Sequence, residues 1–394
     1  MGWFGTLYLL AGVFIAVKGR RILFVLLKDP WIISLIILSG LSCFWSVNLS
    51  ITFASFRSLI VQYILVGYLV TTYSLRKIIG FVSKTLAFMG ALSCLYLIFI
   101  PELGLSIGQH GGVSWRGVFL HQSVLAGSMA LAVVSIAYTF AMEWDNIRSR
   151  ISKIFILSVI GICLWLLFFC GAKTSVVGFI LSCSILPFFF IERIKGMRAR
   201  NLIFVFLVYI FCIGIPLVYF SQEFIIVEVL GKNPTLSGRD VLWEYLLPRA
   251  LEKPFGYGLN AFWFNKILEQ GVIDATGYNY GNSHSNYFDL LLGLGFPGVV
   301  LLFFSVVTVV RRTIILAFNY GLVEFRWALQ ILIILLVGSY SDVFIGFLTA
   351  RTIGWFIFCV ISIKSILALE KLREPAVDKA NYYSIYKSRR SQLN

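Results

Sequence analysis

Long, uninterrupted apolar segments constrain most strongly how this chain of 394 residues folds. Eleven of them follow one another, and most approach the roughly 20 residues that cross a bilayer as a helix. Because their apolar residues are contiguous rather than alternating, they favour helices over the strands of a membrane barrel. We therefore predict an all-α polytopic membrane protein with about 11 (10–12) transmembrane helices. The segments are 3–17, 31–47, 52–73, 78–100, 121–142, 154–171, 174–191, 202–220, 284–310, 327–346 and 349–369.

The composition excludes several other classes of protein. Hydrophobic residues make up 59% of the chain and charged residues 13%, whereas a soluble domain has roughly 25% charged residues. This excludes a disordered chain and an ordinary soluble enzyme. The formal net charge of +15 does not indicate a nucleic-acid partner, because Lys and Arg collect in the cytoplasmic loops of membrane proteins.

The positions of Lys and Arg predict the orientation of the chain. Six segments hold 24 of the 33 Lys and Arg residues, and such an excess marks the cytoplasmic side. This places residues 101–120 and 221–283 outside, and loops of that length are usually functional. The six basic segments are 18–28, 74–84, 143–153, 192–201, 311–326 and 364–394.

The same pattern predicts one integral domain in four parts. We expect N-terminal transmembrane helices in 1–220 and C-terminal transmembrane helices in 284–369. Between them, 221–283 forms an exterior loop with short interfacial helices. Residues 370–394 form a basic cytoplasmic tail that faces the lipid.

The strongest candidate for chemistry is the stretch Gly281–Tyr287 at the outer end of a span. Asn282 or Ser283 is suited to cap the following helix, which would place His284 in its first turn. The positive end of the helix dipole disfavours imidazolium, and a neutral imidazole accepts a proton from a hydroxyl. The alternative is that His284 merely caps and packs. Asn286 is a further candidate for binding substrate.

A second polar stretch, Ser237–Leu247, predicts an interfacial helix with Arg239 at its start. Arginine is suited to bidentate contact with phosphate oxygens, although an ordinary interfacial arginine fits the same pattern. The Gly- and Pro-rich stretch Lys253–Trp263 follows as a turn. Its aromatic residues, among them Tyr257, suit sugar stacking or the membrane interface.

Two further cations lie near the same face. Lys173 occupies a turn too short to reach far into water, so it contacts a phosphate or simply extends towards the interface. Arg116 lies in the other exterior loop and is a candidate phosphate contact. His121, close behind it, binds sugar hydroxyls or caps the next helix, and capping is the simpler interpretation.

Motifs for several other chemistries are absent from the sequence. It contains no Walker A loop and no nucleophile elbow, and its three histidines lack metal-ligand spacing. We therefore expect chemistry that uses no metal, cofactor or soluble nucleotide donor.

These stretches, in this order, resemble the O-antigen ligase/polymerase superfamily of bacterial envelope glycosyltransferases. The resemblance rests on Trp115–Phe119 and on the motifs LSCFWSV, SGRD…W, PFGYGLNAFW and NSHSNYFDLLLGLGFPG. The short exterior loop and the GYGLNAFW element are most similar to the exopolysaccharide polymerase branch.

The resemblance implies a multi-pass protein of the bacterial inner membrane with a site that faces the periplasm. Its donor would be a glycan on undecaprenyl diphosphate, and its acceptor a glycan or a lipid. His284 would activate the acceptor hydroxyl, Arg239 and Lys173 would neutralise the diphosphate, and Arg116 would assist. Family members often have Arg where this chain has Lys173, and lysine lacks the planar fork. Other polysaccharide-assembly proteins are expected partners.

Three functions remain open at this point. A polymerase would join lipid-linked repeat units, and a ligase would transfer the finished glycan to lipid A core or another acceptor. A flippase would need polar residues deep along several spans or broken helices at the midplane. The midspan segments are mainly apolar, which disfavours the flippase, although Asp289 has no evident role.

Overall fold

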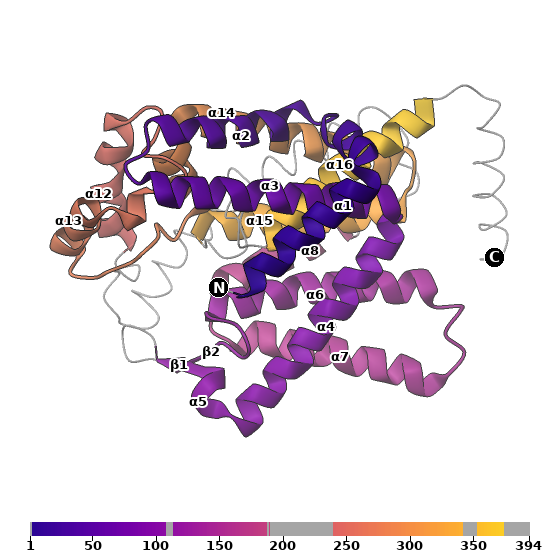
Figure 1. Cartoon of the computed structure of the whole chain (residues 1–394). Coiled ribbons are helices and arrows are strands. Elements are labelled where there is room, and N and C mark those ends of the chain that lie inside the picture. Colours follow the sequence, from indigo (N-terminus) through magenta and orange to yellow (C-terminus); the bar gives the residue numbers. More distant parts are fainter. Residues whose placement is uncertain (1, 108–112, 187–188, 190–238, 342–352, 374–394) are drawn as a thin grey trace.

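The computed structural model describes residues 2–107, 113–186, 189, 239–341 and 353–373 (Figure 1). This part is almost entirely helical, apart from an antiparallel pair, β1 (Leu105–Ile107) and β2 (Val113–Trp115). Within these described ranges, seven helices are long and apolar enough to cross a membrane, which confirms the predicted fold class. They are α3 (Leu49–Thr72), α4 (Leu75–Phe99), α6 (Gln122–Glu143), α7 (Arg150–Phe169), α14 (Asn286–Ile314), α15 (Val323–Ser341) and α16 (Ile353–Arg373).

The N-terminal helices differ from the two spans expected at 3–17 and 31–47. Helix α1 (Gly2–Leu26) is longer than expected and has a non-helical Lys18, whereas α2 (Pro30–Leu41) has only 12 residues. The pair bends by 109° between Leu26 and Pro30 and counts at most as one broken span, the eighth in the described part. The bend is fixed by Asp29, whose side chain accepts a hydrogen bond from the Ile32 amide and caps α2.

Two other expected spans differ or lie outside the described residues. In place of a span over 174–191, the structure has the short apolar helix α8 (Lys173–Cys183). The segment 202–220 and most of the basic tail 370–394 lie outside the described residues. The total of eleven spans and the four predicted parts therefore remain predictions.

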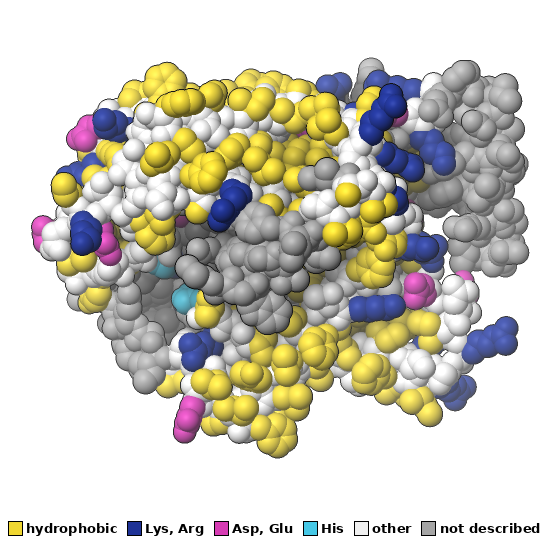
Figure 2. Space-filling model, viewed as in Figure 1, with side chains coloured by type: hydrophobic (Ala, Val, Ile, Leu, Met, Phe, Trp, Pro, Cys, Tyr) yellow, Lys and Arg dark blue, Asp and Glu magenta, His cyan; other side chains and the backbone are white. Residues whose placement is uncertain are grey.

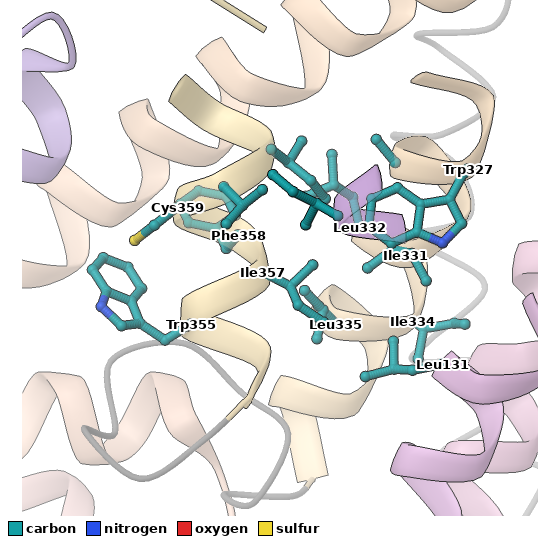
Figure 3. Close-up of a cluster of buried hydrophobic side chains, with 14 of the residues drawn as sticks. Leu131, Trp327, Ile331, Leu332, Ile334, Leu335, Trp355, Ile357, Phe358 and Cys359 are labelled. Carbon is teal, nitrogen blue, oxygen red and sulfur yellow. The ribbon is translucent and has the colours of Figure 1, made fainter. Parts of the chain in front are cut away.

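Helices α6 and α15 form the centre of the bundle. About 78% of the most apolar part of α15 is buried and 67% of that of α6, against 17% in α7 at the periphery. Helix α15 contacts α6, α8, α14 and α16. Its Trp327 packs among the aliphatic side chains in Figure 3, and its indole nitrogen donates to Ser135 Oγ of α6 (3.0 Å).

Short helices lie at one end of the bundle. Within the predicted exterior loop the structure places α12 (Arg239–Glu252), the 3₁₀ turn η4 (Phe262–Phe264) and α13 (Lys266–Thr276). They occupy the left end of the molecule in Figure 1, at the start of α14. The site is assembled at this end.

Basic residues gather at the opposite end, on the right of Figure 2. There Lys28 forms an ion pair with Glu370, and Arg312 pairs with the buried Asp29 at 3.5 Å. Lys364 donates to the backbone of α3 and the following residue, at Val70 O and Tyr73 O. Two of the segments predicted to be cytoplasmic, 18–28 and 311–326, therefore share one end of the bundle with 364–373, the described part of a third.

Candidate active site

The sequence predicted His284 in the first turn of α14. In the structure His284 lies just before this helix. Its backbone φ is +55°, a left-handed conformation that no helical residue adopts. Helix α14 therefore begins at Asn286, with Ser285 as its N-cap. Asn282 does not cap the helix either, because its Oδ1 accepts the His284 amide at 3.0 Å. The result is a tight polar turn that presents the imidazole ahead of the helix.

Residues from two elements hold this turn in place. The indole nitrogen of Trp243 donates to the carbonyl of Ser283 at 2.7 Å. Asp289 Oδ1 accepts the Ser283 amide at 3.1 Å and the indole N–H of Trp263 at 2.9 Å. Both polar backbone groups of Ser283, the residue before His284, are thus occupied. Asp289, whose role the sequence left open, fixes the turn, and the signal for it was a carboxylate in the first turn of an apolar helix.

Helix α12 begins at Arg239, as the sequence predicts. Its apolar face buries Leu242, Leu246 and Ala250 against the turn that contains Phe262 and against α13. The ring of Trp243 stacks on Phe288 of α14, with centroids 5.6 Å apart and planes inclined by 16°. This packing sets the start of α12, and with it Arg239, beside the His284 turn.

Tyr257 has a packing role in this structure. Its side chain is buried, and its hydroxyl donates to the Arg249 carbonyl at 3.0 Å. Its amide donates to Leu292 O at 2.7 Å, and the next amide, of Gly258, donates to Gly293 O at 3.0 Å. The motif with Tyr257 therefore adds backbone hydrogen bonds to α14 instead of presenting an aromatic face to a ligand.

Two glycines allow this close approach of backbones. Gly258 has φ +99°, and a Cβ there would lie 2.5 Å from Ser46 Oγ. Gly295 breaks α14 with φ +65°, and a Cβ there would lie 2.0 Å from Pro254 O. Only glycine fits such positions. The same stretch also binds the early LSCFWSV motif, through Val47 N to Tyr257 O (3.0 Å), Trp45 Nε1 to Phe255 O (3.0 Å) and Leu259 N to Ser42 Oγ (3.3 Å).

Electrostatic interactions connect His284 with two other segments. Burial above all, followed by the electrostatic interactions with Arg239 and His121, lowers the pKa of His284 to about 3. Burial, followed by Arg239, also lowers the pKa of His121. His284 is therefore neutral at pH 7 and lies within electrostatic range of a permanent cation.

His121 caps α6, as the simpler interpretation of the sequence predicted. Its Nδ1 accepts the Ser123 amide at 3.2 Å. An imidazole that accepts at Nδ1 and is neutral carries its proton on Nε2. Figure 2 shows histidine side chains in a hollow of the surface, near the end of the molecule formed by α12 and α13.

Lys173 is the first residue of α8 and is exposed. The turn before it passes close to the start of α6, because a Cβ on Gly171 would lie 3.2 Å from Gln122 Oε1. Gln122 follows His121 directly. The Lys173 turn therefore lies against the same helix start that carries His121.

Arg116 makes hydrogen bonds that stabilise the exterior loop in which it lies. Its Nε donates to Leu103 O and its amide to Gly104 O, both at 2.9 Å. The next residue, Gly117, has φ +57° and packs on Ser93, whose Oγ accepts the Val118 amide at 3.3 Å. These contacts tie the loop before α6 to α4.

The predicted residues thus fall into three groups. Arg239 and His284 lie together with His121, which the sequence favoured as a cap. Lys173 and Arg116 lie on segments that adjoin the start of α6. Tyr257 and Asn286 are buried, the first beside α14 and the second as the first residue of α14. A cation beside a neutral imidazole is suited to bind an anion and to accept a proton from a neighbouring hydroxyl.

The helices and this site define a polytopic membrane protein with polar chemistry at one end of the bundle. Residues 156–303 match the family model described as O-antigen ligase. The match confirms the predicted resemblance to the O-antigen ligase/polymerase superfamily and supports a membrane glycosyltransferase of ligase or polymerase type. The matched range runs from α7 into α14 and includes Lys173, Arg239 and His284. A comparison with curated proteins gave no match.

Proposed function

We propose that the protein polymerises undecaprenyl-diphosphate-linked oligosaccharide repeat units into a surface or exported polysaccharide. The observation that carries this proposal is the neutral His284, held in a rigid turn within electrostatic range of Arg239. A base for a hydroxyl and a cation for a diphosphate are the two groups that such a transfer requires. Basic residues at the other end of the bundle favour a site that faces the periplasm of a bacterial inner membrane.

The proposed reaction is a direct displacement at the anomeric carbon of the donor. The acceptor hydroxyl oxygen forms the new glycosidic bond, and its proton passes to His284. The bond between the anomeric carbon and the diphosphate oxygen breaks, and its electron pair stays on the diphosphate. Arg239, with Lys173 and Arg116, stabilises that negative charge. The displacement inverts the anomeric configuration.

Binding of the donor raises the pKa of His284 and so makes it a better base. A histidine with a pKa of about 3 is a weak proton acceptor in the empty site. Burial is the largest cause of this low pKa, and the charge of Arg239 adds to it. The diphosphate brings negative charge next to Arg239 and so offsets the electrostatic part. The pKa of His284 then rises when the donor is bound, and the base becomes effective in the complex that reacts.

A ligase is the second candidate, because the matching family model is described as O-antigen ligase. The same turn and cations would serve it, with lipid A core or another lipid as the acceptor. The products of a deletion strain separate the two functions. Single lipid-linked repeats accumulate without a polymerase, and long unattached chains accumulate without a ligase.

The decisive test uses purified protein and the lipid-linked oligosaccharide from a deletion strain. We expect His284→Gln to lower the rate of glycan transfer by about 100-fold or more, the range for loss of a general base. Tyr278→Phe, a conservative change at an exposed position of the neighbouring loop, is the control and should retain activity. Transfer at the normal rate by a correctly folded His284→Gln protein would refute the proposed role.

A further inference from the structure

A second site lies at the other end of α14. A cleft of about 390 Å³ opens between the last turns of α14 and helix α16. Its position is some 25 residues along α14 from the His284 turn, which corresponds to about 37 Å of helix. The cleft is therefore separate from the proposed transferase site. Its walls are largely apolar and include Val307, Ile315, Ile366 and Leu369.

The charges that line this cleft are mainly positive. Three arginines, Arg311, Arg312 and Arg373, face one glutamate, Glu370. The glutamate is already paired with Lys28, and Arg312 is paired with Asp29. Arg311 and Arg373 are exposed and form no ion pair within the described part of the chain. The cleft thus has a cationic rim above an apolar floor.

Arg312 is held at the inner side of this rim. Its Nη2 also donates to Ser362 Oγ of α16 at 3.1 Å, and Ser362 donates in turn to Asp29. Helices α14 and α16 are therefore joined across the base of the cleft by a buried polar network. The cleft is a built feature of the bundle rather than a gap between loose surface side chains.

The chemistry of this cleft selects its ligand. Arginines at the ends of membrane helices lie at the depth of lipid headgroups, where they attract phosphate. The apolar floor suits a hydrocarbon chain and would not favour a soluble phosphate compound. We propose that this cleft binds an anionic phospholipid, with the headgroup phosphate on Arg311 and Arg373 and an acyl chain along Val307 and Ile366.

Native mass spectrometry of the purified protein in detergent tests this proposal. Phosphatidylglycerol and phosphatidylcholine are added at equal concentration, and the bound lipid is counted. We expect preferential retention of phosphatidylglycerol. We expect the double variant Arg311→Gln and Arg373→Gln to weaken its binding by roughly 30-fold, from about 1 kcal/mol for each arginine. Thr308→Trp, which fills the cleft without changing its charge, should also reduce binding.

Matched controls distinguish the cleft from general surface charge. Arg20→Gln with Arg21→Gln removes the same charge from exposed positions outside the cleft, and this variant should retain the lipid. Equal loss in both double variants, or no loss in the cleft variant, would overturn the proposal. The melting temperature is also measured with phosphatidylglycerol and with inorganic phosphate. If inorganic phosphate alone raised it as much as the lipid does, the ligand would not be a lipid. Glycan transfer is a separate measurement, so failure here leaves the transferase assignment intact.

Discussion

At the scale of single residues, the site depends on one side chain whose backbone is unusual. His284 combines a left-handed φ of +55° with a half-buried side chain. A non-glycine residue in that region costs free energy and persists only where its surroundings fix it. Here the surroundings are Trp243 and Asp289, which bind the carbonyl and the amide of the preceding Ser283, and Asn282, which binds the amide of the histidine itself.

The low pKa of His284 predicts sensitivity to acid. The unfolded chain binds a proton at a pKa near 6.5 and the folded protein only near 3, so the folded state loses stability as the pH falls between these values. One such group changes the free energy of unfolding by up to about 1.4 kcal/mol per pH unit. We expect His284→Gln to lose less stability than wild type between pH 7 and pH 5. Melting temperatures in detergent measure this, and equal losses would contradict it.

The glycines of the 253–264 stretch give a second prediction. Gly258 has a φ of +99°, and a Cβ added there would lie 2.5 Å from Ser46 Oγ. Gly277 has a φ of +75°, and a Cβ added there would meet no atom within 4 Å. Alanine at position 258 therefore adds a steric contact that alanine at position 277 does not. The left-handed backbone alone costs about 1–2 kcal/mol. We therefore expect Gly277→Ala to lower the free energy of unfolding by that amount and Gly258→Ala to lower it clearly more. Thermal unfolding of the two variants measures this difference. If both variants lowered the melting temperature equally, the contact with Ser46 would have to relax at no cost.

At this scale the sequence predicted residue types better than their roles. The start of α12 at Arg239 followed from helix signals, and the cap formed by His121 followed from its position before an apolar run. The place of His284 did not, because a left-handed residue before a helix looks the same in sequence as a residue in its first turn. Tyr257 was chosen for its aromatic ring, but its burial depends on contacts with Arg249 and Leu292, which lie apart from it in the chain.

At the scale of elements, α12 acts as a support for the turn before α14. Trp243 makes two contacts between them, the stack of its ring on Phe288 and the hydrogen bond of its indole to Ser283 O. The indole thus positions both a ring and a carbonyl. Helix α12 is amphipathic in the predicted sense, but its buried face meets protein side chains rather than lipid alone.

Replacement of this indole separates positioning from binding. Trp243→Phe retains a ring for the stack and removes the hydrogen bond, which costs about 1 kcal/mol. We expect kcat for glycan transfer to fall by several-fold with little change in KM for the donor, because the base is misplaced while the cations remain. Trp45→Phe, which removes a similar indole–carbonyl bond at Phe255 O, is the matched control. A raised KM with unchanged kcat would assign Trp243 to donor binding instead.

Apolar length predicted α3, α4, α6, α7, α14, α15 and α16 within a few residues. It did not predict α1 and α2, where Asp29 and Pro30 turn the chain by a large angle, or the short α8. Hydropathy predicts which segments are apolar enough to enter the membrane, but not where the chain bends. A bend of this kind depends on a buried cap and on the partner Arg312, which lies far away in the chain.

At the scale of the whole molecule, the two ends of the bundle differ in chemistry. The end with α12 and α13 carries the histidines, and the opposite end carries the paired and unpaired cations of α14 and α16. If the positive end faces the cytoplasm, as the distribution of Lys and Arg predicts, Tyr278 and Tyr320 lie on opposite sides of the membrane. Both are exposed.

Cysteine labelling in intact cells tests this orientation. We expect a membrane-impermeant maleimide to label Tyr278→Cys in cells whose outer membrane is permeabilised, and to label Tyr320→Cys only after the inner membrane is opened. The wild-type protein is the control for labelling of its own cysteines. The reverse pattern would place the His284 turn in the cytoplasm and contradict a periplasmic reaction.

The hydrogen bonds of Trp243, Trp263 and Asp289 that hold Ser283 in place have a consequence for biogenesis. These residues come from two stretches made at different times, because Trp243 and Trp263 leave the ribosome before the helix that carries Asp289. If His284 is the proposed base, a nascent chain has no positioned base until α14 has inserted and docked. Under the proposed function, glycan transfer then begins only after α14 has docked beside α12, and a molecule arrested before that step would not react with the lipid-linked donor.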